Sequence, residues 1–208
     1  MEIIAQIDDH DSDLNIRIRV VKMTVMWTTC SFAAHLLNIM NKYLEGTIFT
    51  NMYIEGMAGG IGMVVAVKLY DRFGVKISFV VAFGLCFFGS LLVYFYESGI
   101  FHLPLWYLNE FEGPIKQKNI LALNCMIPRF TFIAKLGIII AFMVTYQASL
   151  SNEDIFPSDK RSTCIGHCQI VARAATILVY EIAELPKPKP IAYNCLIVLL
   201  ALLVSFTI

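Results

Sequence analysis

Residues 77–96 read ISFVVAFGLCFFGSLLVYFY, and no charged side chain lies between Lys76 and Glu97. A helix of this length is ~30 Å long, which matches the hydrocarbon core of a bilayer. A helix at the surface of a water-soluble protein keeps a polar face, and this stretch has none. The stretch therefore predicts a helix that crosses a membrane.

Further apolar runs lie on both sides of this stretch, and each contains one charged residue at most: 23–41, 46–67, 130–152, 162–180 and 190–208. A small soluble domain cannot bury several such helices on every side. We therefore expect an all-α integral membrane protein. Its six transmembrane helices would occupy residues 20–208 and follow an N-terminal segment at 1–19.

The composition supports the same class and excludes several others. Hydrophobic residues make up 58% of the chain and charged residues 15%, whereas soluble domains have roughly 45–50% and 25%. The net charge is zero, which gives no electrostatic basis for binding nucleic acid. The sequence contains neither a nucleotide-binding P-loop nor a catalytic constellation. We expect no enzyme activity, no cofactor and no structural metal, and the lipid bilayer as the main partner.

The distribution of lysine and arginine predicts the topology. Cytoplasmic loops carry more of these residues than outer loops, and eight against six favours both termini in the cytoplasm. The turn at 71–76 and the loop at 151–161 would then be cytoplasmic, opposite the outer loop at 97–127. We expect a multi-pass protein of the plasma membrane or of an organelle membrane.

Two motifs resemble those of a known superfamily. Residues 71–76, Asp-Arg-Phe-Gly-Val-Lys, are similar to the cytoplasmic turn of the major facilitator superfamily. Residues 155–173, which begin Ile-Phe-Pro-Ser and end Ala-Arg, are similar to the signature before the eleventh helix of its organic cation/anion transporters. The resemblance covers nearly the whole chain, which corresponds to the C-terminal half of a twelve-helix transporter.

The resemblance implies both an architecture and a function. Residues 20–96 and 128–208 would be three-helix repeats of inverted topology. A second six-helix half would complete a central cavity for a small organic solute, which moves by alternating access. Asp71, Arg72 and Gly74 would form the conformational turn. Relatives often carry an acidic residue near Gly59 and Gly60, and a proline near Val179 and Tyr180, which are absent here.

Three charged residues interrupt the apolar runs. Arg173 lies near the middle of its run, where a cation is costly unless it faces protein, water or a ligand. In the resembling family an arginine at this position is typical of organic-anion carriers, so Arg173 is a candidate substrate-binding residue, although it could instead be structural. Lys135 is a second substrate-binding candidate. Glu55 lies at the same depth as Lys135 and could couple proton movement to transport or form an ion pair with it.

Other residues within the runs allow functional and structural interpretations. Asn38 and Asn51 could line a substrate cavity or form hydrogen bonds between helices. Gly56 with Gly60, and Ala58 with Gly62, are pairs of small residues that predict close helix packing. His35 and His167 are most simply explained as helix–helix contacts. Cys164, His167 and Cys168 share a helical face, but nothing supplies the fourth ligand of a metal site.

These observations favour a secondary transporter for small organic ions, with anions preferred. One alternative is a non-transporting membrane remnant, which the departures from the family pattern favour. The other is a six-helix channel or receptor. The chain has neither a repeated arginine series, as in a voltage sensor, nor a filter-like loop.

Overall fold

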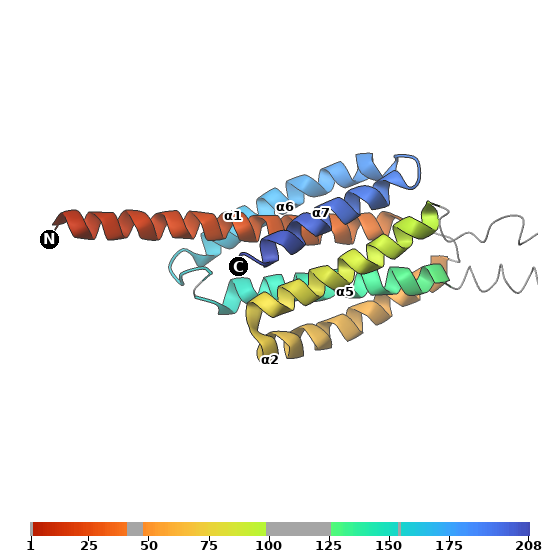
Figure 1. Cartoon of the computed structure of the whole chain (residues 1–208), viewed down its shortest axis with the longest axis horizontal. Coiled ribbons are helices and arrows are strands. Elements are labelled where there is room, and N and C mark those ends of the chain that lie inside the picture. Colours follow the sequence, from red (N-terminus) through yellow and green to blue (C-terminus); the bar gives the residue numbers. More distant parts are fainter. Residues whose placement is uncertain (1, 41–47, 99–125, 154) are drawn as a thin grey trace, which may run out of the picture.

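A computed structural model describes residues 2–40, 48–98, 126–153 and 155–208 of the chain. Within these ranges it contains five helices and no strand (Figure 1): α1 (Glu2–Met40), α2 (Ile48–Glu97), α5 (Met126–Ser151), α6 (Arg161–Ala183) and α7 (Lys189–Ser205). The prediction of an all-helical protein is therefore confirmed. The number of helices differs from the six that we expected, because α2 contains two of the predicted runs.

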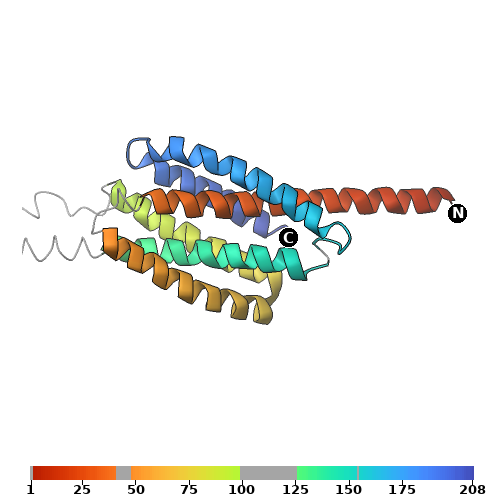
Figure 2. The same cartoon turned by 180° about the vertical axis from the view of Figure 1, so that it is seen from behind.

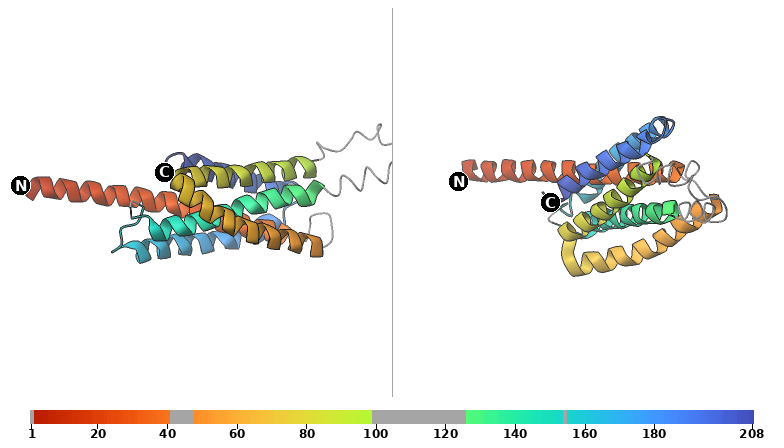
Figure 3. Two further views of the ribbon diagram at one scale, coloured as in Figure 1. Left: turned by 90° about the horizontal axis from the view of Figure 1, so that it is seen from below. Right: turned by 45° about the vertical axis from the view of Figure 1, so that its right-hand side comes forward.

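α2 bends sharply at Gly74. This residue has φ 76° and ψ −178°, values that lie outside the helical range, and a positive φ is readily adopted only by glycine. Ser78 Oγ donates a hydrogen bond of 2.6 Å to the carbonyl oxygen of Gly74 itself, four residues earlier. The two arms, 48–73 and 75–97, consequently run in roughly opposite directions and diverge from the bend (Figure 3). The predicted turn at 71–76 is confirmed.

Four of the described helices are long and apolar enough to cross a membrane: Asn15–Met40, Asn51–Glu97, Arg129–Ser151 and Arg161–Ala183. α7 is also apolar but has only 17 residues. α1 passes without a break through the predicted boundary between 1–19 and the first span, and its N-terminal part projects beyond the other helices (Figure 2). The N-terminal segment and the first span thus form one helix.

The connections that the structure describes fall at two ends of the bundle. One end holds the Gly74 bend, the α5–α6 connection and the C-terminus (Figures 1 and 2). The opposite end holds the end of α2, the start of α5 and the turn between α6 and α7. Residues 71–76 and 151–161 therefore share one end, as predicted. Most of the predicted outer loop at 97–127 lies outside the described residues.

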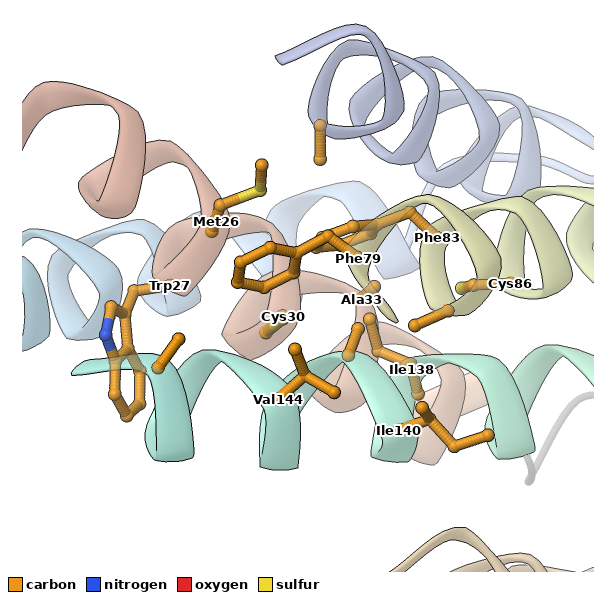
Figure 4. Packing of buried hydrophobic residues seen from close by; sticks show 14 of the residues in the cluster. Met26, Trp27, Cys30, Ala33, Phe79, Phe83, Cys86, Ile138, Ile140 and Val144 are labelled. Atoms are coloured by element: carbon orange, nitrogen blue, oxygen red, sulfur yellow. The ribbon is translucent and has the colours of Figure 1, made fainter. Parts of the chain in front are cut away.

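The core lies where α1, the second arm of α2 and α5 meet. The Phe79 and Phe83 side chains are fully buried and reach into the space between α1 and α5 (Figure 4). Trp27 of α1 donates a hydrogen bond of 3.2 Å from Nε1 to Ser149 Oγ of α5. Its ring also makes an edge contact with the Phe142 ring, with the centroids 5.5 Å apart. Aromatic burial and a satisfied indole N–H thus join α1 to α5.

Two glycines set the distance between α2 and α5. A Cβ atom added to Gly89 would lie 2.3 Å from the Ala134 backbone nitrogen, and one added to Gly137 would lie 2.3 Å from the Cys86 backbone nitrogen. The second arm of α2 and α5 are therefore in backbone contact, which only residues without a side chain permit. The sequence analysis did not single out either glycine.

The predicted packing role of Gly56 and Gly60 is wrong for the described part of the chain. A Cβ atom on either residue would have no neighbour within 4 Å, and both residues are exposed. The other predicted pair, Ala58 and Gly62, is buried and faces α5. A Cβ atom on Gly62 would lie 2.8 Å from Ile139 Cγ2. The two pairs lie on different sides of the arm, and α5 covers only one of those sides.

Candidate functional site

Glu55 and Lys135 form an ion pair between the first arm of α2 and α5. Lys135 Nζ lies 3.1 Å from Glu55 Oε2, with the lysine side chain 3% exposed and the glutamate side chain 38% exposed. Breaking such a pair would leave the lysine charge buried without a partner, which is strongly destabilising. An ion pair with Lys135 was one of the two interpretations of Glu55 from the sequence, and the structure contains this pair. The acidic member of the pair is the more exposed one.

Further polar side chains lie on the same interface. Asn51 is 2% exposed and lies one helical turn before Glu55 on the same side of the arm. Thr131, which is 1% exposed, lies one helical turn before Lys135 on α5, and its hydroxyl makes no hydrogen bond with any residue that the structure describes. The α2–α5 interface therefore contains a small polar cluster, which we define as Asn51, Glu55, Thr131 and Lys135.

Arg173 lies on a different part of the molecule. It is exposed on α6, and no ion pair of its guanidinium occurs within the described part of the chain. The buried side of α6 is formed instead by Cys164, Cys168, Ala172, Val179 and Ala183. Arg173 follows Ala172 and is therefore turned about 100° away from that side.

A stripe of polar and small residues accompanies Arg173 along α6. Its members are separated by alternating steps of four and three residues and so share one side of the helix: Ser162, Gly166, Gln169, Arg173, Thr176 and Tyr180. We call this set the α6 polar stripe. All six residues are exposed or half-buried. The sequence analysis singled out only Arg173, although the periodicity of the polar residues was visible in the sequence.

The remaining candidates are scattered over the molecule. Asn38 is exposed near the end of α1, and the nearby His35 Nδ1 lies 2.7 Å from its own helix's Ser31 carbonyl oxygen. His167 is exposed. The Arg72 guanidinium lies over the adjoining Phe73 ring, 6.0 Å from its centroid. Of the charged residues predicted within the spans, the structure brings together Glu55 and Lys135 but not Arg173.

Metal binding finds no support in the described ranges. They contain no group of three His, Cys, Asp or Glu side chains that could hold a metal ion. Cys168 Sγ instead lies 3.3 Å from Thr24 Oγ1, across the α1–α6 interface. This cysteine thus takes part in helix packing.

The length, apolarity and packing of the helices define a multi-pass helical membrane protein. A curated relative, named "Putative transporter B0252.3", from Caenorhabditis elegans, is 23% identical over 165 residues. The match covers 77% of this chain and 27% of the relative, so the chain spans about a quarter of the length of that protein. No sequence profile of a known family matches the chain. No solved structure matches it either.

Proposed function

We propose that this chain is the C-terminal half of a secondary active transporter that moves small organic anions by alternating access. The observation that carries the proposal is the α6 polar stripe, in which a cation within a membrane-spanning helix points away from its own bundle. Exposure to lipid at mid-depth would cost Arg173 about 2.5–3.5 kcal/mol even on the lenient insertion scale. A water-filled cavity shared with a second six-helix half would remove that cost.

The anion preference follows from the chemistry of the guanidinium group. Arginine keeps its proton in proteins, and its planar fork can hold a carboxylate through two hydrogen bonds. Gln169 and Tyr180 on the same stripe add neutral hydrogen-bonding groups beside it. Asn38, also exposed, is proposed as a further polar group of the substrate cavity. The relative's printed name describes a transporter, which agrees with this assignment.

We further propose six membrane crossings. α2 has 50 residues and is about 75 Å long at 1.5 Å per residue, far more than one crossing needs. Its arms would therefore cross separately, with the Gly74 bend between them. α7, with 17 residues, is about 26 Å long and would cross as the sixth helix, close to the minimum length.

The contacts between helices support an arrangement as two inverted repeats, 20–96 and 128–208. In that arrangement α1 corresponds to α5, the first arm of α2 to α6, and the second arm to α7. The packing of α1 on α6 then corresponds to the packing of α5 on the first arm, and both are present. The contacts of α1 with α7 and of α5 with the second arm correspond in the same way.

Glu55 is proposed as the coupling residue of the transport cycle. When the Glu55 carboxylate takes up a proton it loses its charge, and its ion pair with Lys135 is broken. Lys135 and Asn51 in the polar cluster could then bind the substrate anion. Release of the anion would restore the pair and return the proton to solution.

A chimera tests the proposal. Residues 1–208 replace the corresponding part of the C. elegans relative, and cells that express the chimera are assayed for uptake of radiolabelled monocarboxylates, dicarboxylates and quaternary ammonium ions. We expect carboxylate uptake that Arg173→Ala reduces at least ten-fold and that Arg173→Lys restores in part, since lysine lacks the fork. Uptake should rise at acidic pH in the unchanged chimera and lose this pH dependence in Glu55→Gln.

Membrane abundance, measured on the same cells, separates function from structure. Unchanged carboxylate uptake by an abundant Arg173→Ala chimera would refute the anion site. The second candidate function is a non-transporting remnant, which the departures from the family pattern at Gly59 and Gly60 and at Val179 and Tyr180 favour. It predicts a chimera that inserts normally and moves none of the three classes of ion. A six-helix channel or receptor would instead give ion currents or ligand binding from the chain alone.

A further inference from the structure

An ion pair joins two connections at the end of the bundle opposite the Gly74 bend. Lys187 Nζ donates a hydrogen bond of 3.1 Å to Oε1 of Glu97, which is the last residue of α2. Lys187 belongs to the short turn between α6 and α7, which lies beside the end of α2 (Figures 1 and 2). The Glu97 side chain is 7% exposed and the Lys187 side chain is 44% exposed. The pair therefore ties the α6–α7 turn to α2 through a buried carboxylate and a partly exposed lysine.

A second hydrophobic core adjoins this pair. It is separate from the main core and contains side chains of α1, the second arm of α2, α6 and α7. We call it the end cluster, and its buried members are Phe32, Leu36, Met40, Val93, Tyr96, Val179, Ala183, Ile191 and Cys195. Tyr96 directly precedes Glu97, and Ala183 is the last residue of α6. The ion pair thus continues the attachment that the end cluster provides.

α6 is attached to the bundle at two separate places along its length. Its buried residues are Cys164, Cys168 and Ala172 in the main core, and Val179 and Ala183 in the end cluster. None of the residues 173–178 between these places is buried. Of the four described spans, α6 is the least buried, with 22% of its most apolar stretch inside the bundle. The end of α6 that leads to Lys187 is therefore held by two buried side chains and by the ion pair that follows them.

We propose that the Glu97–Lys187 pair is a clasp that opens and closes during the transport cycle. The closed clasp holds the end of α6 against the end cluster. The open clasp lets this end of α6 move away from α1, which widens access to the α6 polar stripe from this end of the bundle. Lys187 leaves the pair at little cost because its side chain is already partly in water, and movement of the turn then uncovers Glu97 to water. This role rests on the proposed function, since only a transporter uses a cavity along the stripe.

Hydrogen–deuterium exchange tests the clasp on the full chain in lipid nanodiscs, without any transport. Mass spectrometry compares peptides from 174–188 with peptides from 161–172. We expect Lys187→Gln to speed exchange in 174–188 about five-fold, because local opening becomes easier there, and to leave 161–172 unchanged. Glu97→Gln should act in the same way. The double variant Glu97→Lys/Lys187→Glu, which exchanges the two charges, should restore the slow exchange of the unchanged chain.

Lys189→Gln is the matched control. Lys189 is an exposed lysine two residues after Lys187, and no ion pair of its side chain occurs among the residues that the structure describes. Its loss should change exchange by less than about two-fold, as expected for an exposed position. Equal effects of Lys187→Gln and Lys189→Gln would overturn the clasp, and so would faster exchange along the whole of α6. Unchanged exchange in Lys187→Gln would overturn it as well.

Uptake by the chimera distinguishes a moving clasp from a fixed contact. A pair that opens in every cycle should affect the maximal rate more than KM, because a conformational step limits the rate of many such cycles. At equal membrane abundance, Lys187→Gln should lower the maximal rate of carboxylate uptake about three-fold, and the charge-exchanged double variant should recover most of the loss. Faster exchange with unchanged uptake would make the pair a fixed contact and overturn the clasp. A chimera without any uptake would refute the proposed function and the clasp's part in transport, whereas the exchange measurements would still show whether the pair holds α6.

Discussion

α5 and α6 have similar lengths but very different surroundings. Half of the most apolar stretch of α5 is buried within the bundle, compared with 22% of that of α6. Each helix carries one cation within its apolar run. Lys135 of α5 is 3% exposed and paired at 3.1 Å with Glu55, whereas Arg173 of α6 is exposed. The bundle satisfies one charge internally and leaves the other available to something outside the described chain.

The difference shows that two intramembrane cations can have very different structural surroundings. Both cations interrupt an apolar run, but Lys135 is buried and paired with Glu55, whereas Arg173 is exposed. Substitutions on α5 should therefore change the stability of the protein, while those on the α6 polar stripe should change only what it binds. Measurements of stability on matched variants test this separation.

Gly137→Ala should be the most damaging single change. The added Cβ atom would lie 2.3 Å from the Cys86 backbone nitrogen, and neither backbone can move without separating α2 from α5. We expect a loss of about 3 kcal/mol, the upper end of the range for overpacked cores. Thermal unfolding in detergent, followed by size-exclusion chromatography, will measure it. Gly56→Ala is the control, because its Cβ atom has no neighbour within 4 Å; an equal loss there would contradict the proposed crossing.

Glu55→Gln should destabilise the protein by about 2 kcal/mol. It leaves the Lys135 charge buried without its partner, but the 38% exposure of Glu55 keeps the effect below the 3–5 kcal/mol of fully buried pairs. The double variant Glu55→Gln/Lys135→Gln should recover part of the loss. A double-mutant cycle on thermal stability measures the coupling between the two side chains. Additive single effects would show that the pair contributes nothing as a pair.

Ser149→Ala should destabilise the protein by about 0.6 kcal/mol, the average for a hydrogen bond between membrane helices. It removes the acceptor of the Trp27 indole N–H, which lies 3.2 Å away. The same denaturation assay will detect it, together with a change in tryptophan fluorescence as the indole loses its partner. Ser162→Ala, at an exposed position on α6, provides the comparison and should leave both signals unchanged.

Arg173→Gln should have the smallest effect on stability, within about 0.5 kcal/mol of zero, as is usual for exposed positions. Membrane abundance and thermal stability in detergent will measure it, with Lys135→Gln as the matched change of a buried cation. A loss as large as that of Lys135→Gln would show that Arg173 has a structural partner. The comparison between α5 and α6 would then fail.

Hydropathy alone predicted most of the fold, because an apolar run of membrane length has few alternatives to a helix. The turn at Gly74 was also predictable, since its glycine lies among charged residues between two apolar runs. The helices that pack against one another could not be predicted in this way. Gly56 and Gly60 form the more obvious motif, but the contacts with α5 are made by Gly62 and Gly89. Which side of a helix becomes covered depends on the neighbouring helix, and a single helix's sequence does not specify that neighbour.

The candidate site was predictable to a similar degree. The matching depths of Glu55 and Lys135 made their pairing geometrically possible, and the structure contains it. Thr131 and the companions of Arg173 on α6 were missed because polar, uncharged residues attract little attention in an apolar run. Asn38 and Asn51 received the same interpretation from sequence, yet one is exposed and the other is buried. Only the packed bundle distinguishes them.

Glu55 and Lys135 are 80 residues apart along the chain, so the ribosome synthesises them at different times. At a translation rate of roughly 5–20 residues per second, Glu55 emerges from the ribosome about 4–16 s before the lysine that neutralises it. During that interval Lys135 is not yet available to the Glu55 carboxylate. If the two arms cross the bilayer separately, as proposed, the bend at Gly74 would let them enter it together as a hairpin. The strongly apolar second arm would then hold the first in the bilayer until α5 is made.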